Sequence, residues 1–278
     1  MRVLRCALAT LCLFMLLGSC KTVPKKLLFQ AQTATRYSYK NDTIYLTLDN
    51  PLKCPMRYYL SSSDSIFNRK LKQQRVIVLP PQSNTNITIA ADSLQVKTLL
   101  INTGLGNPAE IPMRNTLALP YPKGKTYRVI QAYDGEYSHH EPYSKYAIDF
   151  SLRVGDTVCA ADHGVVVGVI SGYKYGGANK KWKQYANYIT LYHPHIGLYT
   201  QYVHLKHNGA LVKVGDNVQR GQPVGLSGKT GWTDVAHLHF NTLVAVKEGL
   251  MSVPVKFISG VAGASLQPGD RVINTSGL

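Results

Sequence analysis

The chain has 278 residues, of which 45% are hydrophobic and 17% are charged, a balance typical of folded globular proteins. This composition excludes a wholly disordered chain, a collagen-like repeat and a polytopic membrane protein. Lysine and arginine number 31 against 15 aspartate and glutamate, so the formal net charge is +16. Such a charge favours a polyanionic partner: nucleic acid, an anionic membrane surface or an acidic wall polymer.

The first residues predict an export signal. Arg2 and Arg5 form a positive n-region, and residues 7–17 form an apolar run that is too short to span a bilayer unaided. The run leads into Leu-Gly-Ser-Cys at 17–20, which resembles the lipobox read by bacterial lipoprotein signal peptidase. This resemblance implies cleavage before Cys20 and acylation of its thiol. The alternative is a plain secretory signal in which the cysteine is incidental.

These features place the mature protein outside the cytoplasm. We expect it in the bacterial cell envelope, anchored to a membrane by lipid at Cys20, and we therefore expect no nucleic-acid partner despite the positive charge. Beyond Cys20, the cysteines that remain after cleavage are Cys54 and Cys159. Because they show no CxxC or clustered spacing, we expect two buried free thiols. A single Cys54–Cys159 disulfide is the alternative in an oxidising compartment.

Turn residues and changes of pattern divide the chain into segments. The expected order is a signal peptide (1–19), a tether (20–33), a β-sandwich domain (34–118), a linker (119–126), a catalytic domain (127–246) and a C-terminal extension (247–278). No stretch shows helical periodicity long enough for a major helix. The fold class expected from this pattern is mostly β.

Short alternating strands dominate residues 34–118. Ile44, Leu46 and Leu48 alternate with polar residues or tyrosine, so they share one face of a strand. Similar runs occur at 56–60, 75–79, 86–90 and 96–101, with turn clusters between them that include 61–65 and 91–93. This spacing predicts a small β-sandwich. It shows no catalytic constellation, so we expect a spacer or binding module, for which a protein is the candidate partner.

The region after the linker is again rich in strands, with a β-branched run at 164–170. A Gly-Asp phrase occurs three times, within 154–158, 214–218 and 268–272. Because Gly-Asp is typical turn chemistry, each copy predicts a tight turn that opens into a strand.

Histidines and one aspartate lie at strand positions in this region. In the segment 236–240, residues two apart point to the same face, so His237 and His239 project together. The same alternation turns Asp149 and His204 away from their apolar neighbours. Side by side, these strands would line a groove with imidazole and carboxylate groups. A catalytic zinc site uses three such ligands and keeps a fourth position for water.

Other histidines carry simpler expectations. His193 shares strand parity with apolar residues, so we expect it to be packed at a strand end. His163, His195 and His207 stand beside turn residues, and we expect them to be solvated. The loop 172–182 mixes glycine, lysine and aromatic residues, and two interpretations stay open: the wall of a glycopeptide groove or an exposed hairpin.

The phrases around these residues also follow the order of a known family. They are Ser-His at 138–139, Tyr-Ala-Ile-Asp-Phe at 146–150, Ala-Ala-Asp-His-Gly-Val-Val at 160–166, Asn-Tyr-Ile-Thr-Leu-Tyr-His at 187–193, Tyr-Val-His-Leu at 202–205, the Gly-Asp phrase at 214–222 and His-Leu-His-Phe at 237–240. Residues 127–246 thereby resemble the catalytic domain of the lysostaphin-type (LytM-like) zinc metallopeptidases, which are peptidoglycan endopeptidases. The resemblance implies an antiparallel β-sheet groove domain.

The resemblance also implies roles for five residues. His139, Asp149 and His239 would hold Zn²⁺, and His204 and His237 would assist the chemistry. All five positions are filled. The spacing from His139 to Asp149 is longer than in the compact form of the family, so His140 is an alternative ligand; His139 is favoured because it directly follows a serine. Alanine replaces the proline that commonly precedes the His-Leu-His phrase.

The resulting expectation is a zinc metalloendopeptidase that hydrolyses peptide bonds in peptidoglycan cross-bridges or stem peptides. A non-catalytic cell-wall binding or activator protein that uses the same groove is the alternative, and loss of a ligand residue would have favoured it. A lipoyl- or biotinyl-type carrier is a third interpretation, suggested by the Gly-Asp phrases, but no lysine stands at a matching hairpin tip.

The lipid anchor gives the first testable prediction. Cys20→Ala should move the protein from the membrane to the soluble fraction, because the acylated thiol is lost, as measured by fractionation and immunoblotting. Cys54→Ala is the matched control and should stay with the membrane. Unchanged membrane retention of Cys20→Ala would contradict the anchor.

Overall fold

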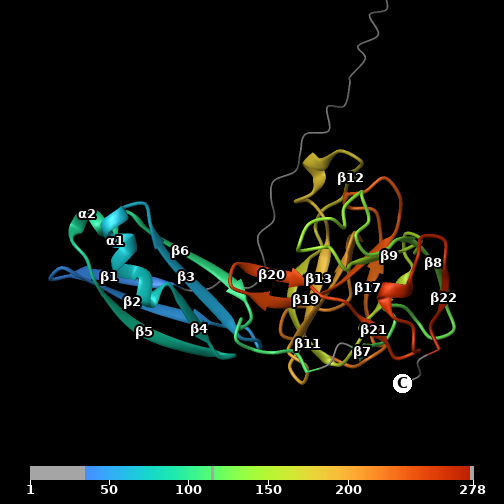
Figure 1. Cartoon of the computed structure of the whole chain (residues 1–278), viewed down its shortest axis with the longest axis horizontal. Coiled ribbons are helices and arrows are strands. Elements are labelled where there is room, and N and C mark those ends of the chain that lie inside the picture. Colours follow the sequence, from blue (N-terminus) through green and yellow to red (C-terminus); the bar gives the residue numbers. More distant parts are fainter. Residues whose placement is uncertain (1–34, 114–115, 276–278) are drawn as a thin grey trace, which may run out of the picture.

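The computed structural model describes residues 35–113 and 116–275 and is mostly β (Figure 1). The predicted signal peptide, Cys20 and the tether 20–33 lie outside the described residues. Within the described ranges, no helix is long and apolar enough to cross a membrane. The prediction of a mostly β, antiparallel fold is confirmed; the predicted domain limits stay a prediction.

Two three-stranded antiparallel sheets form the N-terminal part of the described chain. One sheet has the order β1 (Arg36–Lys40), β2 (Thr43–Asn50) and β5 (Ser83–Ala90), and the other has β4 (Val76–Leu79), β3 (Met56–Ser62) and β6 (Leu99–Leu105). Ile44, Leu46 and Leu48 are at most 1% exposed and share one core with Tyr58 and Leu60 of β3. The expected alternation of β2 is therefore confirmed.

Two short helices appear where only turns were predicted. Asp64 caps α1 (Ser65–Lys70), which continues into η1 (Leu71–Gln74), and Asp92 forms a capping box at α2 (Ser93–Val96). Aspartate caps in this way by accepting hydrogen bonds from the first free N–H groups of a helix. The prediction of a strand from residue 96 is wrong at its start, because α2 occupies that position and β6 begins at Leu99.

The second part of the chain is built on one large sheet (Figure 1). Its order is β16 (Asn217–Val218), β11 (Gly164–Ile170), β13 (Tyr188–His193), β14 (Leu198–Val203), β19 (Leu238–Val246), β9 (Ile148–Phe150), β8 (Thr126–Gln131) and β22 (Arg271–Ile273), with β20 (Gly249–Ser252) paired to β19. A three-stranded sheet of β10 (Thr157–Cys159), β17 (Pro223–Ser227) and β15 (Leu205–Ala210) contributes to the same core.

Smaller elements complete the described chain. They are the parallel pairs β12 (Gly176–Gly177) with β18 (Gly231–Trp232) and β7 (Thr116–Leu117) with β21 (Lys256–Phe257), and the turns η2 (Lys180–Trp182) and η3 (Gly263–Ser265). Both Cys54 and Cys159 are buried free thiols, as expected.

The three Gly-Asp phrases form the same turn. In each copy the glycine has a positive φ: 92° at Gly155, 94° at Gly215 and 106° at Gly269. The following aspartate accepts a hydrogen bond at 2.8–2.9 Å from the backbone N–H three residues before it. A positive φ at the third turn position defines a type II turn and requires glycine. Each turn leads into a strand, β10, β16 or β22, which confirms the prediction.

One face of β13, β14 and β19 carries three rows of neighbouring side chains. From one end of the strands to the other, the rows are Tyr188, Val203 and His239; then Thr190, Gln201 and Asn241; then Tyr192, Tyr199 and Leu243. Residues of the third row belong to the apolar cluster that fills the N-terminal sheets. The first and third rows are about 13 Å apart at about 3.3 Å per residue. The N-terminal sheets thus pack on the face that also carries His239.

Arg57 of β3 forms the polar part of this junction. Its side chain is fully buried and donates to the backbone oxygens of Leu105 (2.6 Å), Gly106 (3.0 Å) and Gly249, and to the hydroxyl of Tyr59. Because Gly249 opens β20, the guanidinium links the N-terminal sheets to the large sheet. Its five donors in a fixed plane suit such a multiple contact.

Replacing this residue should be costly. Arg57→Leu leaves buried carbonyl oxygens without a donor, at about 1–3 kcal/mol each, and should lower the melting temperature by several degrees. The control Arg75→Leu removes an exposed arginine that makes one 3.3 Å contact, to Asn68, and should change stability by less than about 0.5 kcal/mol. Equal melting temperatures for the two variants would contradict the role of Arg57.

Candidate metal centre

Three side chains from distant parts of the chain meet at one end of the large sheet. Asp149 of β9 and His239 of β19 are direct partners in the antiparallel pair, and His239 Nδ1 lies 2.9 Å from Asp149 Oδ1. His139 Nε2 lies 3.2 Å from that same oxygen and 3.2 Å from His239 Nδ1. The three residues are 0%, 4% and 9% exposed for His139, Asp149 and His239.

His139 reaches the cluster from the loop between β8 and β9. Its Nδ1–H donates to the carbonyl oxygen of Ala132 at 2.8 Å, and its backbone N–H donates to Gly135 at 2.9 Å. With Nδ1 occupied, Nε2 is left to face Asp149. The neighbouring His140 is exposed, so the structure brings His139 rather than His140 to the cluster.

The donor set fits a divalent metal ion such as zinc. Two imidazole nitrogens and one carboxylate oxygen are ligands that zinc accepts at about 2.0–2.2 Å. Atoms bound tetrahedrally at that distance lie about 3.3 Å from one another, close to the 2.9–3.2 Å separations found here. These are the three residues that the sequence indicated as ligands, and their geometry supports that assignment.

Burial and neighbouring charges set the protonation of these groups. Burial alone would raise the pKa of Asp149, but His237 and His139 hold it well below its usual value. Burial lowers the pKa of His239, and the neighbouring Asp149 carboxylate opposes this shift only in part. Burial also lowers the pKa of His204 well below its usual value. Burial also acts to lower the pKa of His139, but Asp149 outweighs it and raises that pKa. At neutral pH the carboxylate is therefore ionised, and His204 and His239 keep free lone pairs.

His204 lies beside the cluster in an unusual backbone conformation. Its φ is 66°, and it stands between the end of β14 and the start of β15. The expectation of a regular strand through this residue is wrong. Val203 shares the face of His239, so regular alternation would turn His204 to the opposite face; the left-handed φ lets both line the groove. His204 Nδ1–H donates to the Thr230 oxygen at 2.7 Å.

His237 lies beside His204, next to the cluster. Its Nε2 is 3.6 Å from Asp149 Oδ2, and its ring centroid is 4.6 Å from that of His204. Its Nδ1 is 3.2 Å from both the hydroxyl of Thr233 and the carbonyl oxygen of Val235. Since the Thr233 hydroxyl itself donates to Val235, Nδ1 carries a proton, and Nε2 faces Asp149.

Gln131 belongs to the site although the sequence did not indicate it. Its amide donates to Asp149 Oδ2 at 3.0 Å and to the Ser138 hydroxyl at 2.8 Å. A register shift between Val129 and Gln131 sets Gln131 opposite Asp149 in the pairing of β8 with β9. A lone glutamine in a strand has no motif, so only this pairing reveals it.

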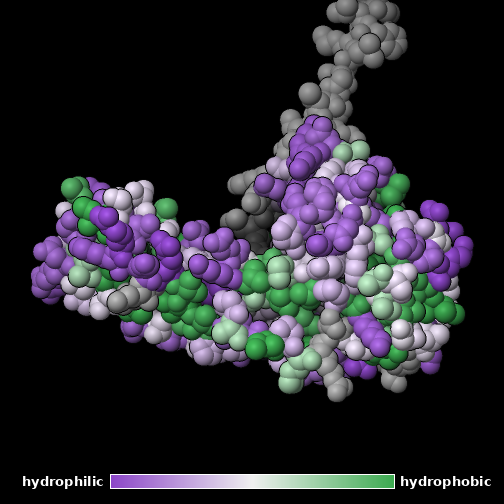
Figure 2. Space-filling model, in the orientation of Figure 1, coloured by the Kyte–Doolittle hydropathy of each residue, from purple (hydrophilic) through white to green (hydrophobic). Residues whose placement is uncertain are grey.

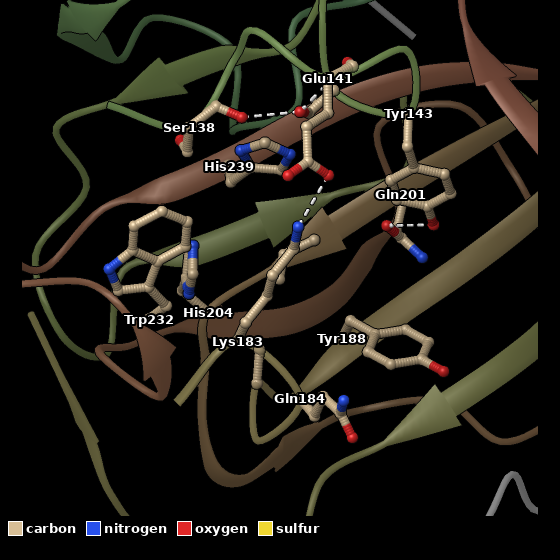
Figure 3. Close-up of a pocket in the computed structure, with 13 residues that line it drawn as sticks. Ser138, Glu141, Tyr143, Lys183, Gln184, Tyr188, Gln201, His204, Trp232 and His239 are labelled. Carbon is tan, nitrogen blue, oxygen red and sulfur yellow. Dashed lines mark hydrogen bonds and ion pairs between the residues drawn. The ribbon is translucent and has the colours of Figure 1, made fainter. Parts of the chain in front are cut away.

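A groove of about 280 Å³ opens over His204 and His239 (Figure 3). Across it, Lys183 Nζ lies 2.8 Å from the carboxylate of Glu141, and the Tyr143 hydroxyl donates to Gln201 at 3.0 Å. Its lining residues are Ser138, Glu141, Tyr143, Ser144, Lys183, Gln184, Ala186, Tyr188, Gln201, Val203, His204, Trp232 and His239.

Trp232 forms part of the groove wall and is supported from two loops. It packs against Tyr137 with ring centroids 5.1 Å apart, and its indole N–H donates to Ala178 at 2.7 Å. The loop 172–182 thus supports the wall but contributes no residue to the lining of the groove. Lys183, the residue that follows it, does line the groove.

The remaining histidines of the sequence analysis differ in their burial. His193 is fully buried, as expected for a packed strand end. His163 and His195 are exposed, as expected, and are also bonded to Asp162. His207 is half-buried, so the expectation of a solvated side chain is wrong there.

Residues 143–249 match the family model described as peptidase family M23. The chain contains a peptidase M23 domain. The matched range includes Asp149, His204, His237 and His239 and begins after His139, whose place in the site rests on the geometry described above.

Each of the curated relatives described here matches less than half of this chain. Peptidoglycan DD-endopeptidase ShyA of Vibrio cholerae is 33% identical over 129 residues, which cover 45% of this chain and 26% of ShyA. Lysostaphin of Staphylococcus simulans is 35% identical over 131 residues, 44% of this chain and 24% of lysostaphin. An uncharacterized metalloprotease of Buchnera aphidicola is 32% identical over 128 residues, and 30% of its length is covered. The chain therefore spans less than a third of each of these relatives.

Solved structures give matches of low overall similarity. The catalytic domain of lysostaphin from Staphylococcus simulans has a TM-score of 0.31 and 28% identity, over 43% of this chain and 80% of that one. A zinc containing peptidase from Vibrio cholerae has a TM-score of 0.35 and 17% identity, over 79% of this chain and 78% of that one.

The hydrogen bond from Gln131 to Asp149 leads to a prediction. Gln131→Leu removes the amide that orients Asp149, and such supporting hydrogen bonds typically contribute about 10–100-fold to metal affinity. We expect a loss of that size in zinc affinity, measured by isothermal titration calorimetry. Gln184→Leu, on the exposed rim of the same groove, is the control and should bind as the parent does. A parental affinity in Gln131→Leu would contradict the role given to its amide.

Proposed function

We propose that this chain is a zinc-dependent endopeptidase that hydrolyses peptide bonds in peptidoglycan cross-bridges or stem peptides. His139, Asp149 and His239 hold the metal, and His204 and His237 act on the reaction. The observation that carries the proposal is the cluster of two imidazoles and a carboxylate, flanked by two more imidazoles, beside a groove in an M23 domain.

The metal, when bound, supplies Lewis-acid polarisation of the scissile carbonyl and lowers the pKa of water towards about 7. The protein's own groups handle the proton. His204 donates its Nδ1–H to the Thr230 oxygen, and burial keeps its ring neutral, so its Nε2 can accept a proton from the attacking water.

His237 presents a second imidazole nitrogen next to His204. Its Nδ1–H is used by Thr233 or Val235, so Nε2 is the nitrogen left to act on the substrate. A protonated imidazole here can donate to the tetrahedral oxyanion or to the leaving amine. The two rings are 4.6 Å apart, close enough for both to reach one substrate carbon.

Three observations support peptidoglycan as the substrate. ShyA is a peptidoglycan endopeptidase by name, the net charge of +16 suits an anionic wall or membrane surface, and the export signal predicted to end at Cys20 agrees with a location in the cell envelope. A protein partner for the N-terminal sheets belongs to the same proposal.

The test separates metal ligands from assisting residues. Asp149→Ala and His239→Ala should lose zinc and cleavage together, because each removes a ligand. His204→Ala and His237→Ala should keep about one zinc and lose roughly a hundred-fold or more in rate, because each removes a proton-transfer or oxyanion group. Zinc content and release of fragments from purified peptidoglycan are measured in the same preparations, with and without chelator.

The outcomes distinguish the alternatives. His140→Ala is the matched control and should keep both zinc and activity, since that side chain points away from the cluster. Full zinc in His239→Ala would reject the ligand set, and loss of zinc in His237→Ala would reject the division of the His-Leu-His pair. A zinc-loaded parent that releases no fragments would favour a non-catalytic binding protein.

A further inference from the structure

A second group of two histidines and one aspartate lies outside the groove. Asp162 and His163 stand in the turn between β10 and β11, and His195 stands in the turn between β13 and β14. His163 Nδ1 is 3.1 Å from Asp162 Oδ1, and His195 Nε2 is 3.0 Å from Asp162 Oδ2. One potential ligand atom from each of the three residues, on two separate turns, lies within 4.8 Å of the other two.

This group shares its donor chemistry with the first cluster. Both contain two imidazoles and one carboxylate, and here each imidazole lies 3.0–3.1 Å from one of the two carboxylate oxygens. The candidate ligand atoms lie within 4.8 Å of one another, so small side-chain rotations bring them onto one zinc ion with ligands at about 2.0–2.2 Å. The groups differ in access, because the side chains of His163 and His195 are 50% and 35% exposed.

The surrounding contacts hold the carboxylate in place. Arg220 donates to Asp162 Oδ1 through Nε at 2.9 Å and Nη2 at 2.8 Å, and the backbone N–H of His163 donates to the same oxygen at 2.9 Å. The other oxygen, Oδ2, faces His195. Ligating carboxylates are commonly fixed by such outer hydrogen bonds, so Arg220 positions Asp162 and offsets part of its charge without covering Oδ2.

The imidazole rings of His163 and His195 lie nearly parallel to each other. Their rings stack with centroids 3.9 Å apart and an interplanar angle of 18°. Nδ1–H of buried His193 also donates to the backbone oxygen of His163 at 2.8 Å, and this hydrogen bond helps to hold the turn. Two stacked rings that both carried a proton and a positive charge would repel each other, whereas two neutral rings can present one nitrogen each to a shared cation.

We propose that Asp162, His163 and His195 form a second divalent-metal site, specific for zinc and similar imidazole-binding ions. Hard cations such as Ca²⁺ prefer sets of oxygen ligands and should not bind here. The bound ion would link the turn before β11 to the turn between β13 and β14. Gly197 of the latter turn lies against Glu110, which accepts a hydrogen bond from Tyr192 at 3.0 Å. The ion would therefore stabilise the turn between β13 and β14, which lies against Glu110.

The test counts zinc sites in the metal-free full chain by isothermal titration calorimetry. The parent should bind two equivalents. The double variant Asp149→Ala and His239→Ala should keep the exposed site, so that it is measured without the groove cluster and without any cleavage assay. In that background, His195→Ala or His163→Ala should weaken zinc binding by at least about tenfold. His207→Ala, which removes a histidine outside both groups, is the matched control and should not.

Thermal denaturation gives a second reading. Excess zinc should raise the melting temperature of the double variant and of its His207→Ala derivative, but not of its His195→Ala derivative. No zinc binding by the double variant, binding there that survives both His163→Ala and His195→Ala, or equal binding of Ca²⁺ would each overturn the proposal. These measurements use the double variant, so they do not depend on the groove cluster, which is tested by zinc content and peptidoglycan cleavage.

Discussion

Side chains alternate between the two faces of β13, β14 and β19, and this alternation positions everything else in the molecule. Ile189, Tyr202 and Phe240 point into the core of the large sheet. Their neighbours on the other face include Gln201 and His239 in the groove. A slip of one residue in any of these strands would exchange the two sets, so core packing and the site enforce the same register. The buried apolar face thereby stabilises the position of polar groups that gain nothing from being buried.

The same face also accounts for the N-terminal sheets. Tyr199 and Leu243 lie two rows beyond His239 along the strands and pack into the apolar cluster of the N-terminal sheets. The N-terminal part therefore covers the apolar end of a face whose other end is the groove. A face that is half apolar needs such a cover, because a large exposed apolar patch is unfavourable in water. The row on which the N-terminal part packs is about 13 Å from the row of His239, a distance set by the rise per residue of the strands.

What could be predicted from the sequence depends on how local the signal is. Asp149 and His239 lie in regular strands between core residues, so alternation alone indicates their direction, although not that β9 pairs with β19. His204 shows the limit. It lines the groove because its φ is positive, and no local pattern predicts a left-handed histidine. Regular strand alternation predicts that His204 lines the groove. His204 does line it, but the backbone at this residue does not follow that alternation.

Loops and bulges carry the remaining parts of the site. Gln131 faces Asp149 only because of a register shift in β8, and the pairing of Glu141 with Lys183 joins two loops that are far apart in sequence. Such contacts depend on tertiary packing, which composition and periodicity do not encode. The same holds for Asp162, His163 and His195, whose proximity appears only when two separate turns are brought together.

The electrostatics of Asp149 argue that its cluster is functional rather than structural. The carboxylate is 4% exposed, and neighbouring charges keep its pKa low, so it is buried in the ionised form. Burying a charge is unfavourable unless it is paired and hydrogen-bonded. Asp149 receives one amide hydrogen bond, from Gln131, and its other close partners are imidazoles, of which burial keeps His239 neutral. Hydrophobic residues of similar volume would stabilise this end of the sheet better. Under the proposed function, a divalent cation bound by Asp149, His139 and His239 would pair with this carboxylate, which is the compensation that a buried charge requires.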